Sequence, residues 1–187
     1  MGLVILVVAA TAFEASLAEG HPVESLTCGI GPVEAALATA AALADRRVDA
    51  VVQIGIAGAQ SLPNGSLAIG SEAVYCDIHD PEARIPRVER IAPDPDLLAV
   101  ARRALPDAHV VPIGTTAHVG GGVGCEVEAM EGFAVLRAAA LAGVPAIELR
   151  SISNAVAERD RSAWSIEDAL GVLGDGLRAL LGELVHA

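Results

Sequence analysis

Two clusters of polar residues flank one very apolar stretch in the second half of the chain. Met130-Glu131-Gly132 lies near its start, and Arg150-Ser151-Ile152-Ser153-Asn154 ends it. The pattern predicts that Glu131 opens a helix after a short strand and that Asn154 closes the next strand. In α/β sheets, ligands bind at the carboxyl ends of strands. A carboxylate and an amide at such an edge indicate a site for a ligand with hydroxyls and a polar heterocycle.

Two further side chains, Glu14 and Trp164, are candidates for the same site. Glu14 follows the first apolar strand, although a lone glutamate is more often a solvated surface residue. Glu131 also has a plain alternative, because the helix dipole favours a carboxylate at a helix start. Its apolar neighbours Met130 and Phe133 leave little water for a carboxylate without a function, which favours a role at a site. Trp164, the single tryptophan, either caps the last helix or covers a flat ligand.

Of two glycine-rich segments, only the second is a candidate ligand contact. GIGPVEAA, which begins at Gly29, lacks the third glycine of the dinucleotide fingerprint, and the chain has no G-x-x-x-x-G-K-[ST] motif for a nucleoside triphosphate. Gly55-Ile56-Ala57-Gly58 follows a predicted strand, so its backbone amides could contact a small ligand. A tight turn that needs glycine explains this segment equally well. The histidines show no metal-ligand spacing.

The composition excludes several classes of protein. The 187 residues carry 24 acids and 12 bases, all of them arginine, and the formal charge of −12 argues against a nucleic-acid partner. No apolar run is long enough to span a bilayer, so we expect no membrane partner. Cys28, Cys76 and Cys125 are odd in number and far apart, which is typical of reduced thiols in a cytoplasmic protein.

Strand-like and helix-like segments alternate without repeats or a linker, which predicts a layered α/β domain over residues 1–187. The expected strands are residues 3–9, 24–28, 49–54, 71–76, 109–113, 126–130 and 145–152. The expected helices are residues 13–19, 32–46, 96–105, 131–142 and 165–185, with loops over 78–95 and 115–124.

Four blocks of sequence resemble the purine nucleosidase and phosphorylase family. In order, they are ATAFE from Ala10, GIGPVEAA from Gly29, VVQIGIAGA from Val51 and VEAMEGFAVLRAAALAGVPAIELRSISN from Val127. Together they span nearly the whole chain, which makes the resemblance specific. It implies a three-layer α/β/α sandwich with a central, mostly parallel mixed sheet, and a homodimer or a larger assembly built from one. The last block and the tail ERDRSAW are similar to the branch that cleaves futalosine in menaquinone biosynthesis.

The resemblance implies roles in breaking the bond between a purine and its ribose. Glu14 falls where nucleosidases keep the glutamate that orients and deprotonates the attacking water. Arg150 matches an arginine near that water. Met130 and Glu131 match the pair that packs under the ribose and binds its hydroxyls.

The same resemblance implies contacts with the base and with the 5′ side of the nucleoside. Ser153 and Asn154 match the pair at the purine ring, where Asn154 would stabilise the departing base. Trp164 falls where relatives use a phenylalanine to wall the 5′ side, and His118 falls near a residue that lines the base. Gly58, in the third block, is expected to contact the substrate.

The chain departs from the family pattern at several positions. Asn154 replaces the aspartate of adenine-cleaving members, and an amide can accept from a protonated N7 and donate to a 6-oxo group, which favours hypoxanthine. Gln53 stands near the arginine that holds phosphate in phosphorylases, and the basic phosphate loop is missing, so water is the expected nucleophile. The segment from His118 to Glu126 is shorter and richer in glycine than in relatives, and Ile56 replaces a serine.

The expected activity is therefore hydrolysis of the N-glycosidic bond of futalosine, with no metal or cofactor. An adenine-releasing methylthioadenosine/adenosylhomocysteine nucleosidase is an alternative, and so is a nucleoside-binding protein without turnover. Futalosine carries a benzoate on its 5′ extension. We expect one or more of Arg84, Arg87, Arg159 and Arg161 to pair with that carboxylate, because a guanidinium fits it with two parallel hydrogen bonds.

Overall fold

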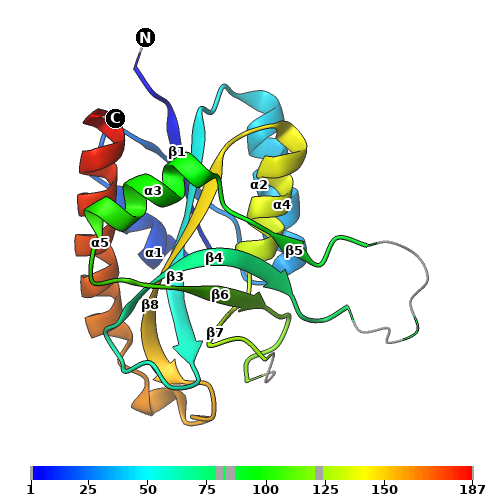
Figure 1. Ribbon diagram of the computed structural model, residues 1–187, viewed down its shortest axis with the longest axis vertical. Helices are drawn as coiled ribbons and strands as arrows, with labels where there is room; N and C mark the ends of the chain where they lie inside the picture. Colours follow the sequence, from blue (N-terminus) through cyan, green and yellow to red (C-terminus); the bar gives the residue numbers. More distant parts are fainter. Residues whose placement is uncertain (1, 79–81, 83–86, 121–123, 187) are drawn as a thin grey trace.

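The computed structural model describes residues 2–78, 82, 87–120 and 124–186. Within these residues, eight strands form one mixed sheet in the order β2-β1-β3-β7-β6-β4-β5, and β8 pairs with both β3 and β4 (Figure 1). The strands are β1 (Ile5–Ala9), β2 (Glu24–Thr27), β3 (Ala50–Ala59), β4 (Leu67–Tyr75), β5 (Arg90–Ile91), β6 (His109–Thr115), β7 (Val127–Ala129) and β8 (Ala146–Ala155).

Helices cover both faces of this sheet, so the expected three-layer α/β/α sandwich is confirmed (Figure 1). α2 and α4 pack on one face, and α3 and α5 pack on the other. The helical segments are α1 (Ala12–Ala15), η1 (Ser16–Ala18), α2 (Pro32–Asp45), α3 (Pro95–Ala104), α4 (Gly132–Ala142), η2 (Arg161–Ala163) and α5 (Ile166–His186). No described helix is long and apolar enough to cross a membrane.

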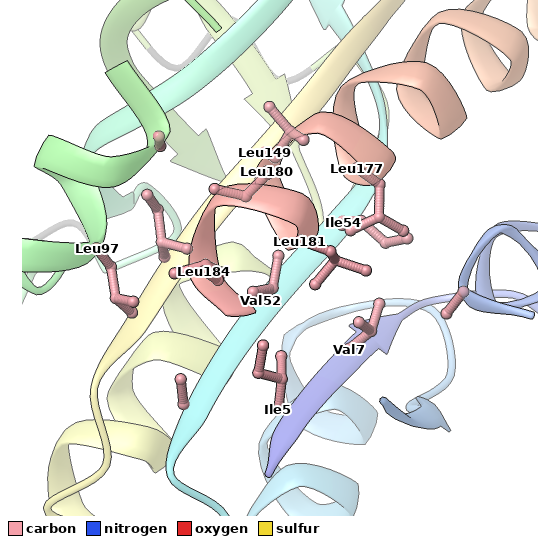
Figure 2. Close-up of a cluster of buried hydrophobic side chains, with 14 of the residues drawn as sticks. Ile5, Val7, Val52, Ile54, Leu97, Leu149, Leu177, Leu180, Leu181 and Leu184 are labelled. Atoms are coloured by element: carbon pink, nitrogen blue, oxygen red, sulfur yellow. The ribbon is translucent and has the colours of Figure 1, made fainter. Parts of the chain in front are cut away.

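The core explains why β1 is apolar at every position. Its side chains alternate between the two faces, and all five residues are buried. Ile5 and Val7 join the cluster with α3 and α5 shown in Figure 2, while Leu6 and Val8 join the cluster with α2 and α4. A strand covered on both faces needs apolar residues on both, which is the pattern read from the sequence.

Part of the sheet closes on itself, which the sequence did not indicate. β3 pairs with β7, β7 with β6, β6 with β4, β4 with β8, and β8 again with β3. This ring of strands encloses small and aliphatic side chains, among them Ala57, Ile113 and Ile152. The closed ring brings the carboxyl ends of β3 and β8 together with the short β7.

Two sequence expectations about element boundaries were wrong. The segment Gly55 to Gly58 is not a turn after a strand, because β3 continues through it to Ala59. The expected loop over 78–95 contains the short β5 and the first residue of α3, although residues 79–81 and 83–86 of it lie outside the described part of the chain. The other expected strands and helices are present, with ends that shift by a few residues.

Candidate active site

A cavity of about 580 Å³ opens where β1 and β8 end, beside the second half of β3. This volume suits a small-molecule ligand. Four of its lining side chains are carboxylates, and two are arginines. The lining consists of Ala10, Thr11, Phe13, Glu14, Ile30, Ile56, Ala57, Gly58, Val119, Gly120, Glu128, Ala129, Met130, Glu131, Arg150, Ser153, Asn154, Val156, Arg161, Trp164, Ile166, Glu167 and Leu170.

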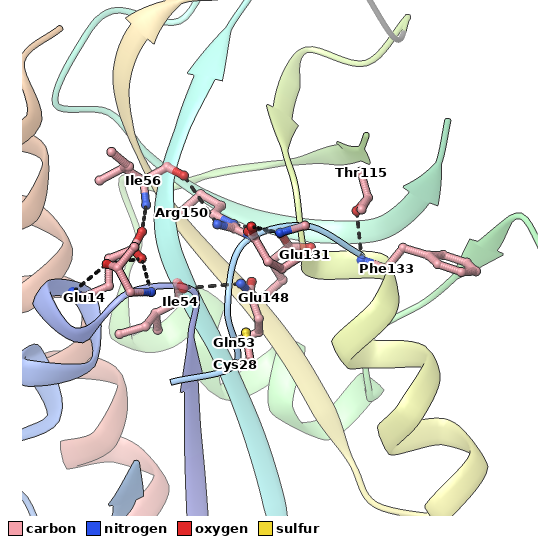
Figure 3. Close-up of polar contacts among 12 residues, drawn as sticks. Glu14, Cys28, Gln53, Ile54, Ile56, Thr115, Glu131, Phe133, Glu148 and Arg150 are labelled. Atoms are coloured by element: carbon pink, nitrogen blue, oxygen red, sulfur yellow. Dashed lines mark hydrogen bonds and ion pairs between the residues drawn. The ribbon is translucent and has the colours of Figure 1, made fainter. Parts of the chain in front are cut away.

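Glu14 is fixed in the cavity wall by hydrogen bonds from three donors. Oε2 accepts from the backbone N–H of Thr11 at 3.0 Å and from its hydroxyl at 2.8 Å, and Oε1 accepts from the N–H of Ile56 at 3.0 Å (Figure 3). Thr11 and Glu14 form the capping box of α1, so the start of that short helix sets the position of the carboxylate. Glu14 is 6% exposed, which rules out a solvated surface residue.

Arg150 lies between the carboxyl groups of Glu131 and Glu148, and its side chain is 1% exposed. Its Nη2 donates to Oε2 of Glu131 at 3.3 Å, its Nε to Oε1 of Glu148 at 2.9 Å, and its Nη1 to the carbonyl of Ile56 at 3.3 Å (Figure 3). Burial alone would lower the pKa of Arg150, but the carboxyls of Glu148, Glu131 and Glu14 raise it. The guanidinium therefore keeps its positive charge beneath the cavity.

Glu131 occupies the N-cap position of α4 but makes no capping hydrogen bond there. The hydroxyl of Thr115 accepts from the N–H of Phe133 at 2.8 Å, so a donor in the first turn of α4 is satisfied without Glu131. Instead, Oε1 of Glu131 accepts from the N–H of Gly31 at 3.1 Å, while Oε2 faces Arg150. A capping hydrogen bond therefore does not account for this carboxylate, and its side chain lines the cavity.

A β-bulge turns Ser153 and Asn154 toward the same cavity. The pairing of β3 with β8 matches Ala57 with Ile152 and then Gly58 with Asn154, so Ser153 is skipped. A bulge lets two successive side chains share one face, which a regular strand forbids. The hydroxyl of Ser153 donates to Oδ1 of Asn154 at 2.8 Å. Gly58 matters here, because a Cβ at that position would lie 3.1 Å from Nδ2 of Asn154.

Trp164 and Arg161 form the part of the cavity next to α5. The guanidinium of Arg161 stacks over the indole, with 5.7 Å between Cζ and the ring centroid. The indole N–H donates to the carbonyl of Glu158 at 3.3 Å. The N–H of Ser165 donates to the carbonyl of Ser153 at 2.9 Å, which ties this segment to β8. Trp164 thus lines the cavity, as expected for a residue that covers a ligand.

His118, which was expected to line the base, lies outside the cavity lining. Its side chain is 68% exposed, and its Nδ1 lies 3.1 Å from the hydroxyl of Thr116 and 3.8 Å from Asp77. Val119 and Gly120 line the cavity instead. The N–H of Gly120 donates to Oε1 of Glu128 at 2.6 Å, which holds this end of the glycine-rich segment. Residues 121–123 of that segment lie outside the described part of the chain.

Sequence reasoning missed two buried carboxyls, Glu128 and Glu148. Glu128 lines the cavity from β7, and Glu148 lies behind the wall against Arg150. Burial raises the pKa of Glu148, and Arg150 only partly offsets this. The signal was present in the period-two pattern of strands, because each glutamate comes two residues before an expected site residue, Met130 or Arg150.

The structure also locates Gln53 and the arginines that were expected at the 5′ extension of the substrate. Gln53 is fully buried and does not line the cavity, and its Nε2 donates to the carbonyl of Ile54 at 3.2 Å. Of the three described arginines expected at the 5′ extension, Arg87, Arg159 and Arg161, only Arg161 lines the cavity. Arg87 pairs with Glu89, and Arg84 lies outside the described residues.

The arrangement combines three chemical capabilities in one enclosed space. The carboxylate of Glu14 can hold and deprotonate a water molecule. The carboxylate of Glu131 can accept hydrogen bonds from hydroxyls and stabilise positive charge. The amide of Asn154 can both donate to and accept from a heterocycle. Among the described residues, no cluster of histidine, cysteine, aspartate or glutamate is arranged to hold a metal ion.

Comparisons with known proteins agree with this geometry. The family described as Phosphorylase superfamily matches residues 7–185. A futalosine hydrolase of Streptomyces coelicolor is 36% identical over 182 residues, which cover 83% of this chain and 77% of the relative. A futalosine hydrolase of Thermus thermophilus is 30% identical over 219 residues, which cover 95% of each chain.

A solved structure shows the same fold. The 5′-methylthioadenosine/S-adenosylhomocysteine nucleosidase of Colwellia psychrerythraea 34H, in complex with adenine, superposes with a TM-score of 0.87 at 21% identity. The match covers 98% of this chain and 96% of that one. The chain therefore belongs to the phosphorylase superfamily and, within it, to the futalosine hydrolase family.

Proposed function

We propose that residues 1–187 form one nucleosidase-like domain that hydrolyses the N-glycosidic bond of futalosine. The products are hypoxanthine and dehypoxanthine futalosine, and the reaction is a step of menaquinone biosynthesis. The observation that carries this proposal is that Glu14, Glu131 and Asn154 line one cavity around a buried arginine. The choice of futalosine comes from the named relatives and from the amide at position 154.

The orientation of the Asn154 amide supports a 6-oxopurine as the leaving group. Nδ2 donates to the carbonyl of Ala155 at 2.9 Å, and a carbonyl can only accept, so the amide cannot be reversed. The hydroxyl of Ser153 then occupies one lone pair of Oδ1. One N–H and one lone pair remain for a ligand. They match the 6-oxo group and the protonated N7 of departing hypoxanthine.

The proposed reaction is a displacement at C1′ of the ribose. Glu14 takes a proton from water, whose oxygen bonds to C1′ while the C1′–N9 bond breaks and its electron pair leaves with the base. The base takes a proton at N7 from solvent, and Glu14 later returns the proton of the attacking water to solvent, so that protons balance. Asn154 accepts a hydrogen bond from the N7–H of the departing base. Glu131 binds the ribose hydroxyls, and its negative charge favours the cationic sugar of the transition state.

Water, not phosphate, is the proposed nucleophile. A phosphate near C1′ would be bound most strongly by a cation that has no other partner. Of the two arginines in the lining, Arg150 is already bonded to two glutamates, and Arg161 lies beside Trp164 and α5. Gln53, which replaces the phosphate-binding arginine of phosphorylases, does not reach the cavity at all.

Arg161 is the proposed partner of the benzoate on the 5′ extension of futalosine. It lines the cavity beside Trp164, the residue that falls where relatives wall the 5′ side. It forms no ion pair with a described carboxylate, in contrast to Arg150. Its planar fork and the indole beneath it suit an aromatic carboxylate.

We further propose that the protein is a cytoplasmic homodimer or a larger homo-oligomer. Large apolar side chains lie exposed at the cavity mouth and along the outer face of α2, with Phe13 80%, Ile30 63%, Val33 68% and Leu37 65% exposed. Phe13 and Ile30 also line the cavity, so a second copy on this surface would enclose the substrate. Analytical ultracentrifugation of wild type and of Leu37→Glu tests this, and a monomeric wild type contradicts it.

One assay separates the candidate activities. Purified protein is incubated with futalosine, methylthioadenosine and inosine, each with and without phosphate, and purine release is followed. The proposal predicts fast hypoxanthine release from futalosine and no acceleration by phosphate. Adenine release from methylthioadenosine as the fastest reaction would make the protein an adenine-releasing nucleosidase. Binding of futalosine without release of any base would leave it a nucleoside-binding protein.

A further inference from the structure

Glu148 is a fully buried carboxyl that does not touch the cavity. It lies on β8, two residues before Arg150, and its Oε1 accepts from Nε of that arginine at 2.9 Å. Its second oxygen, Oε2, has no hydrogen-bond partner within the described structure. A buried oxygen without a partner is costly, so its protonation state needs an explanation.

The start of α4 leaves the space that this carboxyl occupies. A Cβ at Gly132 would overlap both carboxyl oxygens of Glu148, so only glycine leaves the space that they occupy. Gly132 directly follows Glu131, whose carboxylate bonds to the other side of Arg150. Glu148 and Glu131 are thus held on the same guanidinium by one helix start.

Gln53 is the neighbour of Glu148 on the adjacent parallel strand. The two residues are register partners in the pairing of β3 with β8, and both are fully buried. Gln53 donates from Nε2 to the carbonyl of Ile54, which fixes the direction of its amide because a carbonyl cannot donate. Its Oε1 therefore faces away from Ile54, and it too lacks a hydrogen-bond donor in the described structure.

We propose that Glu148 is a protonated positioning residue, which donates from Oε2 to Oε1 of Gln53 and accepts from Arg150 through Oε1. A protonated carboxyl can donate one hydrogen bond and still accept others. One proton would then satisfy both buried oxygens, and it would join the two hydrogen bonds present in the structure, from Arg150 to Glu148 and from Gln53 to the carbonyl of Ile54.

The charge balance of the cluster points the same way. Among the described residues, Arg150 is the only cation bonded to Glu131 and Glu148, and Glu14 acts on it as well. Three ionised carboxyls around one buried guanidinium would leave an excess of two negative charges, which burial opposes. With Glu148 neutral, the charge of Arg150 is shared by Glu131 and Glu14 alone. The thiol of Cys28, drawn beside Gln53 in Figure 3, is neutral because burial raises its pKa to about 12.

The consequence for catalysis rests on the proposed function. Glu148 would orient Arg150 without neutralising it, so that Arg150 holds Glu131 in its substrate-facing position and lies close to Glu14. Loss of this contact would lower kcat through displacement of Arg150 and would change KM less. Replacement of the acid by its neutral amide would be tolerated.

Two variants of the full chain test this inference. E148Q keeps a carbonyl for Arg150 and an N–H₂ for Gln53, so we expect kcat for futalosine within about threefold of wild type. E148L removes both contacts at similar size, and we expect kcat to fall by about 10², as for a small displacement of a catalytic group. If E148Q is as impaired as E148L, the carboxyl is ionised and the inference is wrong.

A spectroscopic measurement decides the protonation state without any activity. The infrared difference spectrum of wild type minus E148Q at neutral pH should contain the carbonyl band of a protonated carboxyl. A carboxylate band instead would overturn the inference. This comparison needs no substrate, so it stands even if no nucleoside is cleaved and the proposed function fails. It also needs no E148L protein, so poor folding of that variant does not affect it.

Discussion

The guanidinium of Arg150 occupies the space that a side chain at Gly55 would take. A Cβ on this glycine would collide with Nη1 of Arg150 and would lie 3.0 Å from Oε1 of Glu14. Because Gly55 has no side chain, Arg150 and Glu14, the proposed base, can both lie against the backbone of β3. Glycine is required here for close approach and not for an unusual backbone angle, because Gly55 has no positive φ.

Gly55→Ala should therefore abolish most activity while the fold survives. The added methyl would push Arg150 and Glu14 apart, and a displacement of about 1 Å at a catalytic group costs roughly 10² in rate. We expect that loss in kcat for futalosine, with an unchanged circular dichroism spectrum. Gly171→Ala is the matched control, because a Cβ there meets nothing within 4 Å. Near-normal turnover by Gly55→Ala would show that the two side chains need not be so close.

Glu14→Gln should bind substrate but turn it over very slowly. Glutamine keeps the size of the side chain and can still accept from Thr11 or Ile56, yet it cannot take a proton from water. Loss of a general base lowers kcat by roughly 10² to 10⁴. Calorimetry should find affinity for futalosine within a few-fold of wild type. Glu167→Gln, a change in another carboxylate of the lining, should leave kcat almost unaffected.

Much of the site could be predicted because its residues follow apolar strands. The run before Glu14 and the run before Asn154 are buried strands, and sheet geometry brings their carboxyl ends together. Glu131 was also expected correctly at the start of a helix. What these positions share is a local pattern, an apolar strand followed by a polar residue, which one sequence displays directly.

The remainder depends on contacts between distant segments. Glycines normally end a strand, but β3 runs through Gly55 and Gly58 because side chains of β8 fill the space beside them. The bulge that turns Ser153 toward the cavity arises from the pairing with β3, and no residue type marks it. His118 fell outside the cavity because its imidazole lies against Thr116 and near Asp77, and Asp77 is far from it in the sequence.

The stability of the protein should depend on pH through Glu148. Burial raises the pKa of this carboxyl, so the folded state keeps a proton that the unfolded state loses above the ordinary carboxyl pKa of about 4.3. Its contribution to stability is complete below that pH and is lost as pH rises toward the folded-state pKa. Over that interval the unfolding free energy of wild type should fall, relative to E148Q, by up to about 1.4 kcal/mol per pH unit.

Urea unfolding of both proteins at a series of pH values measures this difference. E148Q is the proper reference, because it has the same size and cannot titrate. A difference that stays constant with pH would mean that Glu148 does not change its protonation on folding. A difference that grows in favour of wild type as pH rises would mean that the buried carboxyl is ionised and stabilised by Arg150.

Arg161→Ala should weaken futalosine binding without affecting a nucleoside that lacks the benzoate. Arg161 is exposed, so its pair with a carboxylate is worth only about 0.5–1 kcal/mol, or roughly a two- to fivefold rise in KM. The KM for inosine should not change. Arg159→Ala is the control, because that arginine does not line the cavity. If Arg161→Ala raises KM equally for both nucleosides, the role of Arg161 is to support Trp164 by stacking on it, and it does not bind the benzoate.

Asn154→Asp should change which purine is released. Hypoxanthine presents an acceptor at position 6 and adenine presents a donor, so the free N–H of the fixed Asn154 amide suits only the former. Two buried donors that face each other cost about 1–3 kcal/mol. This corresponds to about one to two decades in preference for futalosine over its 6-amino analogue, aminodeoxyfutalosine. A protonated carboxyl at this position can donate to N7 and accept from the amino group, which should shift the preference toward the analogue.

The quantity to measure is the ratio of kcat/KM for the two substrates in wild type and in Asn154→Asp. Asn64→Asp serves as the control, because this amide bonds to Ser165 and does not line the cavity. If Asn154→Asp lowers kcat/KM strongly for both substrates and the ratio stays unchanged, Asn154 stabilises the departing base but does not decide which base is cleaved. The discrimination between the two purines would then have to come from Val119 and Gly120, which line the same cavity, and the amide would no longer support futalosine over an adenine nucleoside.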